Sequence, residues 1–143
     1  MSDNKKDILS KLSDVNLVYF EKNKNFKYVN VNECNAKGAG LNSPQEMIGK
    51  SDYDLIWKDC SANIFRETDI KILLGQSKIN YLEKVKLRDG VHSMLITKTA
   101  LRNSQDELIG IVGSAMYIDD YVVIQKKVIL VRKNKNFIWI HWA

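Results

Sequence analysis

The side chains that most often carry enzyme chemistry are few in this chain of 143 residues. Its only histidines are His92 and His141, and its only cysteines are Cys34 and Cys60. The sequence contains no His-Glu-x-x-His, Gly-x-Ser-x-Gly or Cys-x-x-Cys motif, so it lacks the signatures of zinc peptidases, serine hydrolases and dithiol redox proteins. We therefore expect no catalytic residues, no metal site and no enzymatic activity.

Two glycine motifs have an alternative interpretation as ligand-binding loops. Gly49-Lys50-Ser51 resembles the end of a phosphate-binding loop, but that loop needs a glycine where Pro44 stands. Gly110-Ile111-Val112-Gly113 has the spacing of a loop that clamps nucleic acid, but its interior is apolar and lies in a predicted strand. We interpret the first motif as a helix end followed by a new cap, and the second as close packing or pocket space.

The net charge of +5 belongs to the end of the chain. Residues 122–143 hold five basic side chains and no acidic one, whereas the first 121 residues hold 17 of each sign. A neutral body argues against a basic face that binds nucleic acid directly. The longest apolar runs are Val128–Val131 and Phe137–Ile140, far shorter than the roughly 20 residues of a membrane-spanning helix.

The N-terminus and the cysteines indicate the compartment. The first seven residues are polar and lack the apolar stretch of a secretion signal. Two cysteines form no disulfide scaffold, which favours a reducing environment. We expect a cytoplasmic protein with no membrane span and no direct contact with nucleic acid.

Residue periodicity predicts the elements that would position a site. Residues 4–14 form a short amphipathic helix with Ile8, Leu12 and Val15 on one stripe. Residues 17–31 form a hairpin, and a longer helix covers residues 61–74 after several short helical turns.

The second half of the chain has the period of β-strands. Residues 79–87 and 91–101 alternate, whereas residues 108–117 are apolar on both sides, as a central strand should be. Asp89-Gly90 between the first two is the strongest short hairpin signal. The whole order predicts an α+β fold, in which one five-stranded antiparallel sheet has short helices on one face.

Two strings between the hairpin and the long helix signal helix starts. Ser43-Pro44-Gln45-Glu46 has the cap residue, the proline at the first helical position and the returning acid of a capping box. Ser51-Asp52-Tyr53-Asp54 repeats the cap pattern.

Taken in order, these strings resemble a PAS domain, the small sensor module of bacterial signalling proteins. The segment Gly40–Leu55 is close to the family's GLSPEEIIGKTDYDL stretch, and further matches are Phe26–Asn30, Phe65–Asp69, Asp89-Gly90 and Gly110–Gly113. The resemblance implies the PAS fold. It divides the chain into an N-terminal helix (1–14), a PAS domain (15–120) and a basic, aromatic tail (121–143).

The resemblance also implies a ligand pocket between the sheet and the helices around residues 51–74. The residues that it assigns to the pocket are Tyr53, Trp57, Phe65, Ile72, Tyr81, Leu95, Thr97, Thr99, Ile111, Gly113 and Ala115. Thr97 and Thr99 would face inward, where their hydroxyls need partners, and Gly113 and Ala115 would leave volume opposite them. This set suits a small, partly polar ligand, and a filled core without a ligand fits equally well. Gly113→Leu is then expected to block the pocket.

The resemblance sets expectations about cofactors. Haem-binding members generally carry an axial histidine on the long helix, and residues 61–74 contain none. Flavin-binding members use a cysteine in an Asn-Cys-Arg-Phe-like motif, which residues 51–56 do not match. We expect no cofactor and interpret His92 as a solvated side chain beside the Asp-Gly turn.

The leading hypothesis is a sensor or interaction module of a bacterial signal-transduction protein. It would bind a small molecule or a partner and relay binding by a conformational change. The alternatives are a ligand-free dimerisation module and, third, a haem- or flavin-binding redox or light sensor. The N-terminal helix predicts a homodimer. An output domain, either a histidine kinase or a DNA-binding regulator, is absent from the sequence, which we interpret as a fragment or a truncated paralogue.

The tail repeats part of the first hairpin. Lys22-Asn23-Lys24-Asn25-Phe26 recurs as Lys133-Asn134-Lys135-Asn136-Phe137. The repeat predicts the start of a second PAS-like unit, while chance similarity in a lysine- and asparagine-rich chain, or a truncated linker, explains it equally well. Its β-branched and aromatic residues predict an extended tail rather than a helix.

Overall fold

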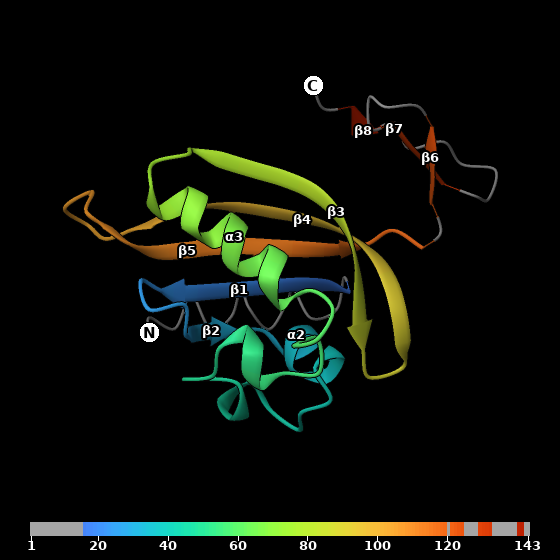
Figure 1. Ribbon diagram of the computed structural model, residues 1–143, viewed down its shortest axis with the longest axis horizontal. Helices are drawn as coiled ribbons and strands as arrows, with labels where there is room; N and C mark the ends of the chain where they lie inside the picture. Colours follow the sequence, from blue (N-terminus) through green and yellow to red (C-terminus); the bar gives the residue numbers. More distant parts are fainter. Residues whose placement is uncertain (1–15, 120, 125–128, 133–139, 142–143) are drawn as a thin grey trace.

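The computed structural model describes residues 16–119, 121–124, 129–132 and 140–141. Its main body is a five-stranded antiparallel sheet with the strand order β2-β1-β5-β4-β3 (Figure 1). The strands are β1 (Leu17–Asn23), β2 (Tyr28–Val31), β3 (Lys78–Leu87), β4 (Gly90–Arg102) and β5 (Leu108–Tyr117). β5 is central, as its two-sided apolar pattern predicts.

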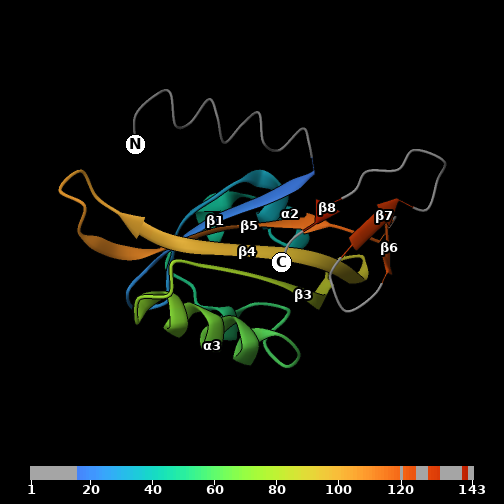
Figure 2. The ribbon, with the colours of Figure 1, turned by 90° about the horizontal axis from the view of Figure 1, so that it is seen from above.

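Helices and short turns connect β2 to β3. They are α2 (Glu33–Gly38), the 3-10 turns η1 (Pro44–Glu46) and η2 (Asp52–Asp54), and α3 (Ala62–Leu73). Figure 2 shows α3 lying along one side of the sheet, which we call the inner face. The predicted α+β fold, with one five-stranded antiparallel sheet and short helices, is confirmed.

The strand register determines which side chains point toward the helices. Ile96 lies opposite Ala115 across β4 and β5, and Lys98 lies opposite Gly113. Directly opposed residues share one face of a sheet, and Ile96, Lys98 and Ala115 all line the same internal cavity. The inner face of β4 therefore carries the even-numbered residues from Met94 to Lys98.

The long helix α3 contributes a buried stripe to the core. Phe65, Thr68, Asp69 and Ile72 are its buried residues beyond the first turn, at the three- and four-residue spacing of a helix face. The stripe includes the carboxylate of Asp69.

The described part of the tail is extended. Its strands β6 (Tyr121–Ile124), β7 (Ile129–Arg132) and β8 (Ile140–His141) form a separate three-stranded antiparallel sheet. The second PAS-like repeat stays a prediction. The predicted helix over residues 4–14 lies outside the described residues, and within those residues no helix has the length and apolarity needed to cross a membrane.

Candidate ligand-binding site

An internal cavity of about 40 Å³ lies between the inner face of the sheet and the helices. Its walls are mostly apolar and aromatic, with two lysines among them. The lining residues are Val18, Phe20, Lys22, Tyr28, Asn35, Gly38, Trp57, Phe65, Val85, Leu87, Met94, Ile96, Lys98, Ala115 and Tyr117. An apolar lining with a few placed polar groups is typical of small-molecule sites.

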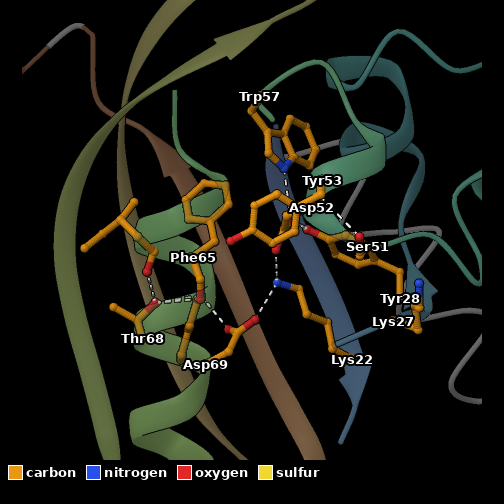
Figure 3. A network of polar contacts seen from close by, with 12 residues as sticks. Lys22, Lys27, Tyr28, Ser51, Asp52, Tyr53, Trp57, Phe65, Thr68 and Asp69 are labelled. Atoms are coloured by element: carbon orange, nitrogen blue, oxygen red, sulfur yellow. Dashed lines mark hydrogen bonds and ion pairs between the residues drawn. The ribbon is translucent and has the colours of Figure 1, made fainter. Parts of the chain in front are cut away.

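The two lysines belong to a buried network with two aspartates. Figure 3 shows Lys22 of this network together with Asp52 and Asp69. Lys22 Nζ donates hydrogen bonds to Asp52 Oδ2 at 2.5 Å and to Asp69 Oδ2 at 2.7 Å. Lys98 Nζ donates to Asp69 Oδ1 at 2.6 Å. None of the four residues is more than 3% exposed. Because two positive charges meet two negative charges, each ion has the partner that a buried charge requires.

Neutral groups complete this network. Tyr28 Oη and Trp57 Nε1 donate to Asp52 Oδ1 at 2.5 and 2.9 Å. Lys98 Nζ also donates to Thr68 Oγ1 at 2.9 Å and to the Phe65 carbonyl oxygen at 3.1 Å. Among the described residues, every buried side-chain nitrogen and oxygen has a hydrogen-bond partner. A network satisfied in this way holds one arrangement of its side chains.

The second capping motif positions Asp52. The Ser51 hydroxyl accepts a hydrogen bond from the Tyr53 backbone N–H, and Asp54 Oδ2 accepts one from the Ser51 backbone N–H. These bonds start η2, in which successive side chains point about 120° apart because a 3-10 helix has three residues per turn. Asp52 is consequently buried, while Tyr53 is 42% exposed.

Burial and neighbouring charge act against each other on the lysines. Burial is the largest influence on Lys98 and, together with the Lys22 charge, lowers its pKa to about 8. Burial also lowers the pKa of Lys22, but the two carboxylates outweigh it and the pKa is raised. The Lys22 ammonium likewise outweighs burial at Asp52 and lowers that pKa. Lys98 is therefore the lysine of the pair that loses its proton first as pH rises.

Three of the predicted site residues line the cavity. Trp57 and Phe65 form part of its aromatic wall, with ring centroids 6.3 Å apart and nearly perpendicular planes. Ala115 lines it from β5. Their role in binding a ligand stays a prediction.

Three further predicted residues belong to the surrounding core. Ile72 and Ile111 are 1% and 0% exposed, and neither lines the cavity. The Tyr81 hydroxyl lies 3.1 Å from Thr68 Oγ1, next to the buried network.

The predicted inward orientation of Leu95, Thr97 and Thr99 is wrong. They alternate with Ile96 and Lys98, which line the cavity, so they lie on the opposite face of β4. Thr97 Oγ1 donates to Asn80 Oδ1 on β3 at 2.8 Å. The error came with the residue-by-residue resemblance, which put the odd-numbered residues of β4 on the inner face, whereas Asp69 holds Lys98 there.

The predictions for Tyr53 and Gly113 are also wrong. Tyr53 lies at the surface, with its hydroxyl donating to Asn63 Oδ1 and the Arg66 guanidinium 5.1 Å from its ring centroid. Gly113 leaves no free volume, because a Cβ atom there would lie 2.5 Å from Phe20 Cζ. The absence of a side chain at Gly113 makes room for Phe20 rather than for a ligand.

None of the four charged residues of the network was predicted from the sequence as a site residue. One available signal was the two-residue period of a strand. Lys22 follows Phe20 by two residues and Lys98 follows Ile96 by two, so each lysine shares a strand face with an apolar residue. The other was Asp69, which lies four residues after Phe65 on the buried stripe of α3. Two lysines and an aspartate on buried faces predict mutual pairing.

The His92 side chain, predicted to be solvated, is 22% exposed and is paired at both ring nitrogens. Its Nδ1 lies 2.6 Å from Asp119 Oδ2 and its Nε2 lies 2.7 Å from Asp89 Oδ1. The hydrogen bond to Asp119, followed by that to Asp89, raises the pKa of His92. Among the described residues, no group of three or more histidine, cysteine or acidic side chains has the arrangement of a metal site.

A family model matches most of the chain. The model describes the PAS fold, and the match covers residues 11–118. No curated protein matches the chain significantly.

Solved structures of other proteins share the fold. The VqmA–ligand–DNA complex of Vibrio cholerae superposes with a TM-score of 0.74 at 20% identity, over 84% of this chain and 53% of that chain. A PAS domain from Colwellia psychrerythraea gives 0.64 at 14% identity, over 81% and 98% of the two chains. The PAS domain of the Cronobacter turicensis quorum-sensing receptor RpfR gives 0.60 at 19% identity, over 72% and 94%. This chain thus spans about half the length of VqmA.

Proposed function

The chain belongs to the PAS fold family, and on that premise we propose that it is a non-catalytic sensor module. It binds a small, partly polar ligand in the internal cavity and relays binding by a change in packing. The observation that carries this proposal is the cavity itself, whose walls combine aromatic and aliphatic side chains with the Lys22 and Lys98 ammonium groups.

The size and lining of the cavity define the ligand class. A volume of about 40 Å³ accommodates a water molecule, which needs about 10–15 Å³ on this measure, so a ligand must displace side chains on entry. Its polar part would accept a hydrogen bond from the Lys22 ammonium, and its apolar part would contact Phe65 and Ile96. Displacement of packed side chains is also what turns binding into a structural signal.

Proteins of the same fold support this proposal. VqmA has been solved bound to DPO, and the RpfR PAS domain has been solved with BDSF and with C12:0. In VqmA the matched region is about half of a chain that binds DNA. We propose that the present module likewise acts on an output domain or protein, by analogy of fold.

A ligand-free dimerisation module is the second candidate. It is favoured by the complete hydrogen bonding of the network among the described residues, because a satisfied network needs no ligand to fill it. Both candidates agree on the fold and differ in whether the cavity is occupied in the working protein.

Native mass spectrometry distinguishes the two candidates. We expect the purified full-length chain to carry a small molecule that is released on denaturation, and to show neither a Soret band nor stoichiometric flavin absorption. Ala115→Met should abolish the bound mass, because the longer side chain fills the cavity that Ala115 lines. Ser114→Met, on the opposite face of β5, is the matched control and should retain it. A protein without bound mass under all conditions would favour the dimerisation module.

Self-association is a separate prediction. The stripe Ile8, Leu12 and Val15 predicts that residues 1–14 contribute to a homodimer, and VqmA has been described as a dimer. We expect sedimentation of the full chain, whose monomer mass is 16.5 kDa, as a dimer, and a shift toward the correspondingly lighter monomer when residues 2–14 are deleted. Truncation after Asp120 is the control and should leave the dimer intact. A full chain that stays monomeric at high micromolar concentration would contradict this prediction.

A further inference from the structure

The cavity adjoins a surface groove at the end of α2. Gly38 and Tyr117 line the cavity and also line this groove, whose other walls include Glu33, Lys37 and Arg88. A Cβ atom at Gly38 would lie 3.4 Å from the Tyr117 hydroxyl oxygen, so the phenol rests against the helix end where cavity and groove meet. Rotation of the Tyr117 side chain would join the two spaces.

The Tyr117 ring is held by His92. The two rings meet edge to face, with centroids 5.1 Å apart and planes at 87°. His92 is fixed in turn at both ring nitrogens by Asp89 and Asp119. Asp119 Oδ1 also accepts a hydrogen bond from the Ser93 backbone N–H at 2.8 Å, which ties this carboxylate to β4.

We propose that the Tyr117 side chain is a gate, called the door below, through which a small molecule passes between groove and cavity. His92, paired with Asp89 and Asp119, holds this gate closed and is called the latch. The proposal rests on the proposed function and adds to it a side chain that controls access to the same cavity. When Tyr117 swings out it leaves His92 and loosens the clamp. Asp119 is the second residue after β5, so entry of a ligand changes the chain where it leaves the sheet.

The latch weakens as pH rises. Both ring nitrogens face carboxylates, so a full clamp needs the imidazolium, which donates on both sides. In the described part of the chain the charged groups that face His92 are Asp89, from the β3–β4 turn, and Asp119. Tyr117 on β5 presents a neutral phenol, and Val85 on β3 lies opposite. These acids raise the pKa of His92 above 6.5. The clamp is therefore complete below that pH and is lost as pH rises through the raised value.

A cysteine inside the cavity reports door opening without any ligand. The test uses the full chain with Cys34→Ser and Ala115→Cys, keeps exposed Cys60 as the internal reference, and uses methyl methanethiosulfonate as the probe. Mass spectrometry gives the ratio of the modification rate of the introduced cavity thiol to that of Cys60. His92→Gln should raise this ratio roughly tenfold at about pH 6, the effect expected for loss of two ion pairs.

Two further variants separate a door from general loosening. Gly38→Ala should lower the ratio, because the added methyl group packs against the Tyr117 hydroxyl. Asp106→Asn removes the Arg102–Asp106 ion pair at the other end of β4 and β5 and should leave the ratio unchanged. Circular dichroism checks that each variant is folded.

The outcomes decide the proposal. In the parent the ratio should rise from about pH 6 to about pH 8, and in His92→Gln it should be flat. Equal ratios for the parent and His92→Gln at the lower pH, or an equal rise in Asp106→Asn, would overturn the latch. A Gly38→Ala variant that reacts as fast as the parent would overturn the door. Because the assay needs no ligand, its failure leaves the sensor proposal standing, and an empty cavity in native mass spectrometry leaves the door standing.

Discussion

Asp69→Asn should destabilise the protein by about 3–5 kcal/mol, the usual effect of removing one partner from a buried ion pair. The Asp69 side chain is fully buried and accepts hydrogen bonds from both lysine ammonium groups. Without its charge, Lys22 and Lys98 share the single carboxylate of Asp52. Since a domain is stable by only about 5–15 kcal/mol, the midpoint of urea unfolding should fall steeply.

The loss should depend on pH in a defined direction. Burial already lowers the pKa of Lys98 to about 8 from its ordinary 10.5, so between these values the unfolded chain binds more protons and this group's contribution to stability rises with pH. In Asp69→Asn the pKa of Lys98 falls further, because its carboxylate partner is gone. The difference in unfolding free energy between the variant and the wild type should therefore be smaller at about pH 9 than at about pH 6. At the lower pH, Lys98 must stay charged or release its proton at a cost.

A matched control is available at the surface. Asp106→Asn makes the same chemical change at a side chain that is 90% exposed and forms an ion pair with Arg102 at 3.9 Å. Solvent screens that pair, so its urea midpoint should barely move. An Asp69→Asn variant as stable as Asp106→Asn would show that the network is not held by charge pairing.

The fold was predictable from sequence because its signals are local. Alternation marked the strands, Asp89-Gly90 marked the β3–β4 hairpin, and the Ser51–Asp54 string marked η2. Each of these patterns depends on residues within a few positions of one another, so no knowledge of the distant chain was needed. The resemblance then implied the PAS fold.

The site was predictable only in part because its polarity depends on distant partners. The alternation of β4 separates Lys98 from Thr97 and Thr99 but does not by itself say which set faces the helices, and Asp69, which holds Lys98 on the inner face, lies 29 positions away. The resemblance placed the odd-numbered residues of β4 inward, so Leu95, Thr97 and Thr99 were assigned to the wrong face. The same resemblance assigned Ala115 on β5 to the correct face.

The buried network and the door occupy different ends of the proposed sensor. The lysines, aspartates and Tyr28 form a rigid polar end. The door, Tyr117, is the last residue of β5, where the chain leaves the sheet. A ligand that fills the cavity therefore meets one wall that resists displacement and one side chain held mainly by a histidine. Displacement should follow the weaker contact, toward Tyr117.

Gly113→Leu should destabilise the domain by about 3 kcal/mol or more, as severe overpacking does, rather than merely blocking a pocket. A Cβ atom at this position would lie 2.5 Å from Phe20 Cζ and 2.5 Å from the Thr97 carbonyl oxygen. The phenyl ring could move, but the carbonyl belongs to the backbone of β4, which is paired with β5. The strands must separate to admit the side chain, and thermal unfolding should report a large fall in melting temperature.

Gly38→Ala provides the comparison for this prediction. Gly38 has an ordinary helical conformation, and its added Cβ would meet the Tyr117 hydroxyl at 3.4 Å, an ordinary contact. An alanine in a helix is favoured over glycine by about 0.5–1 kcal/mol, so this variant should melt at or above the wild-type temperature. If Gly113→Leu instead melts at the same temperature as Gly38→Ala, the Phe20 ring must have moved away from its position on the inner face. The volume beside Gly113 would then be available to a ligand, and the cavity would extend along β5.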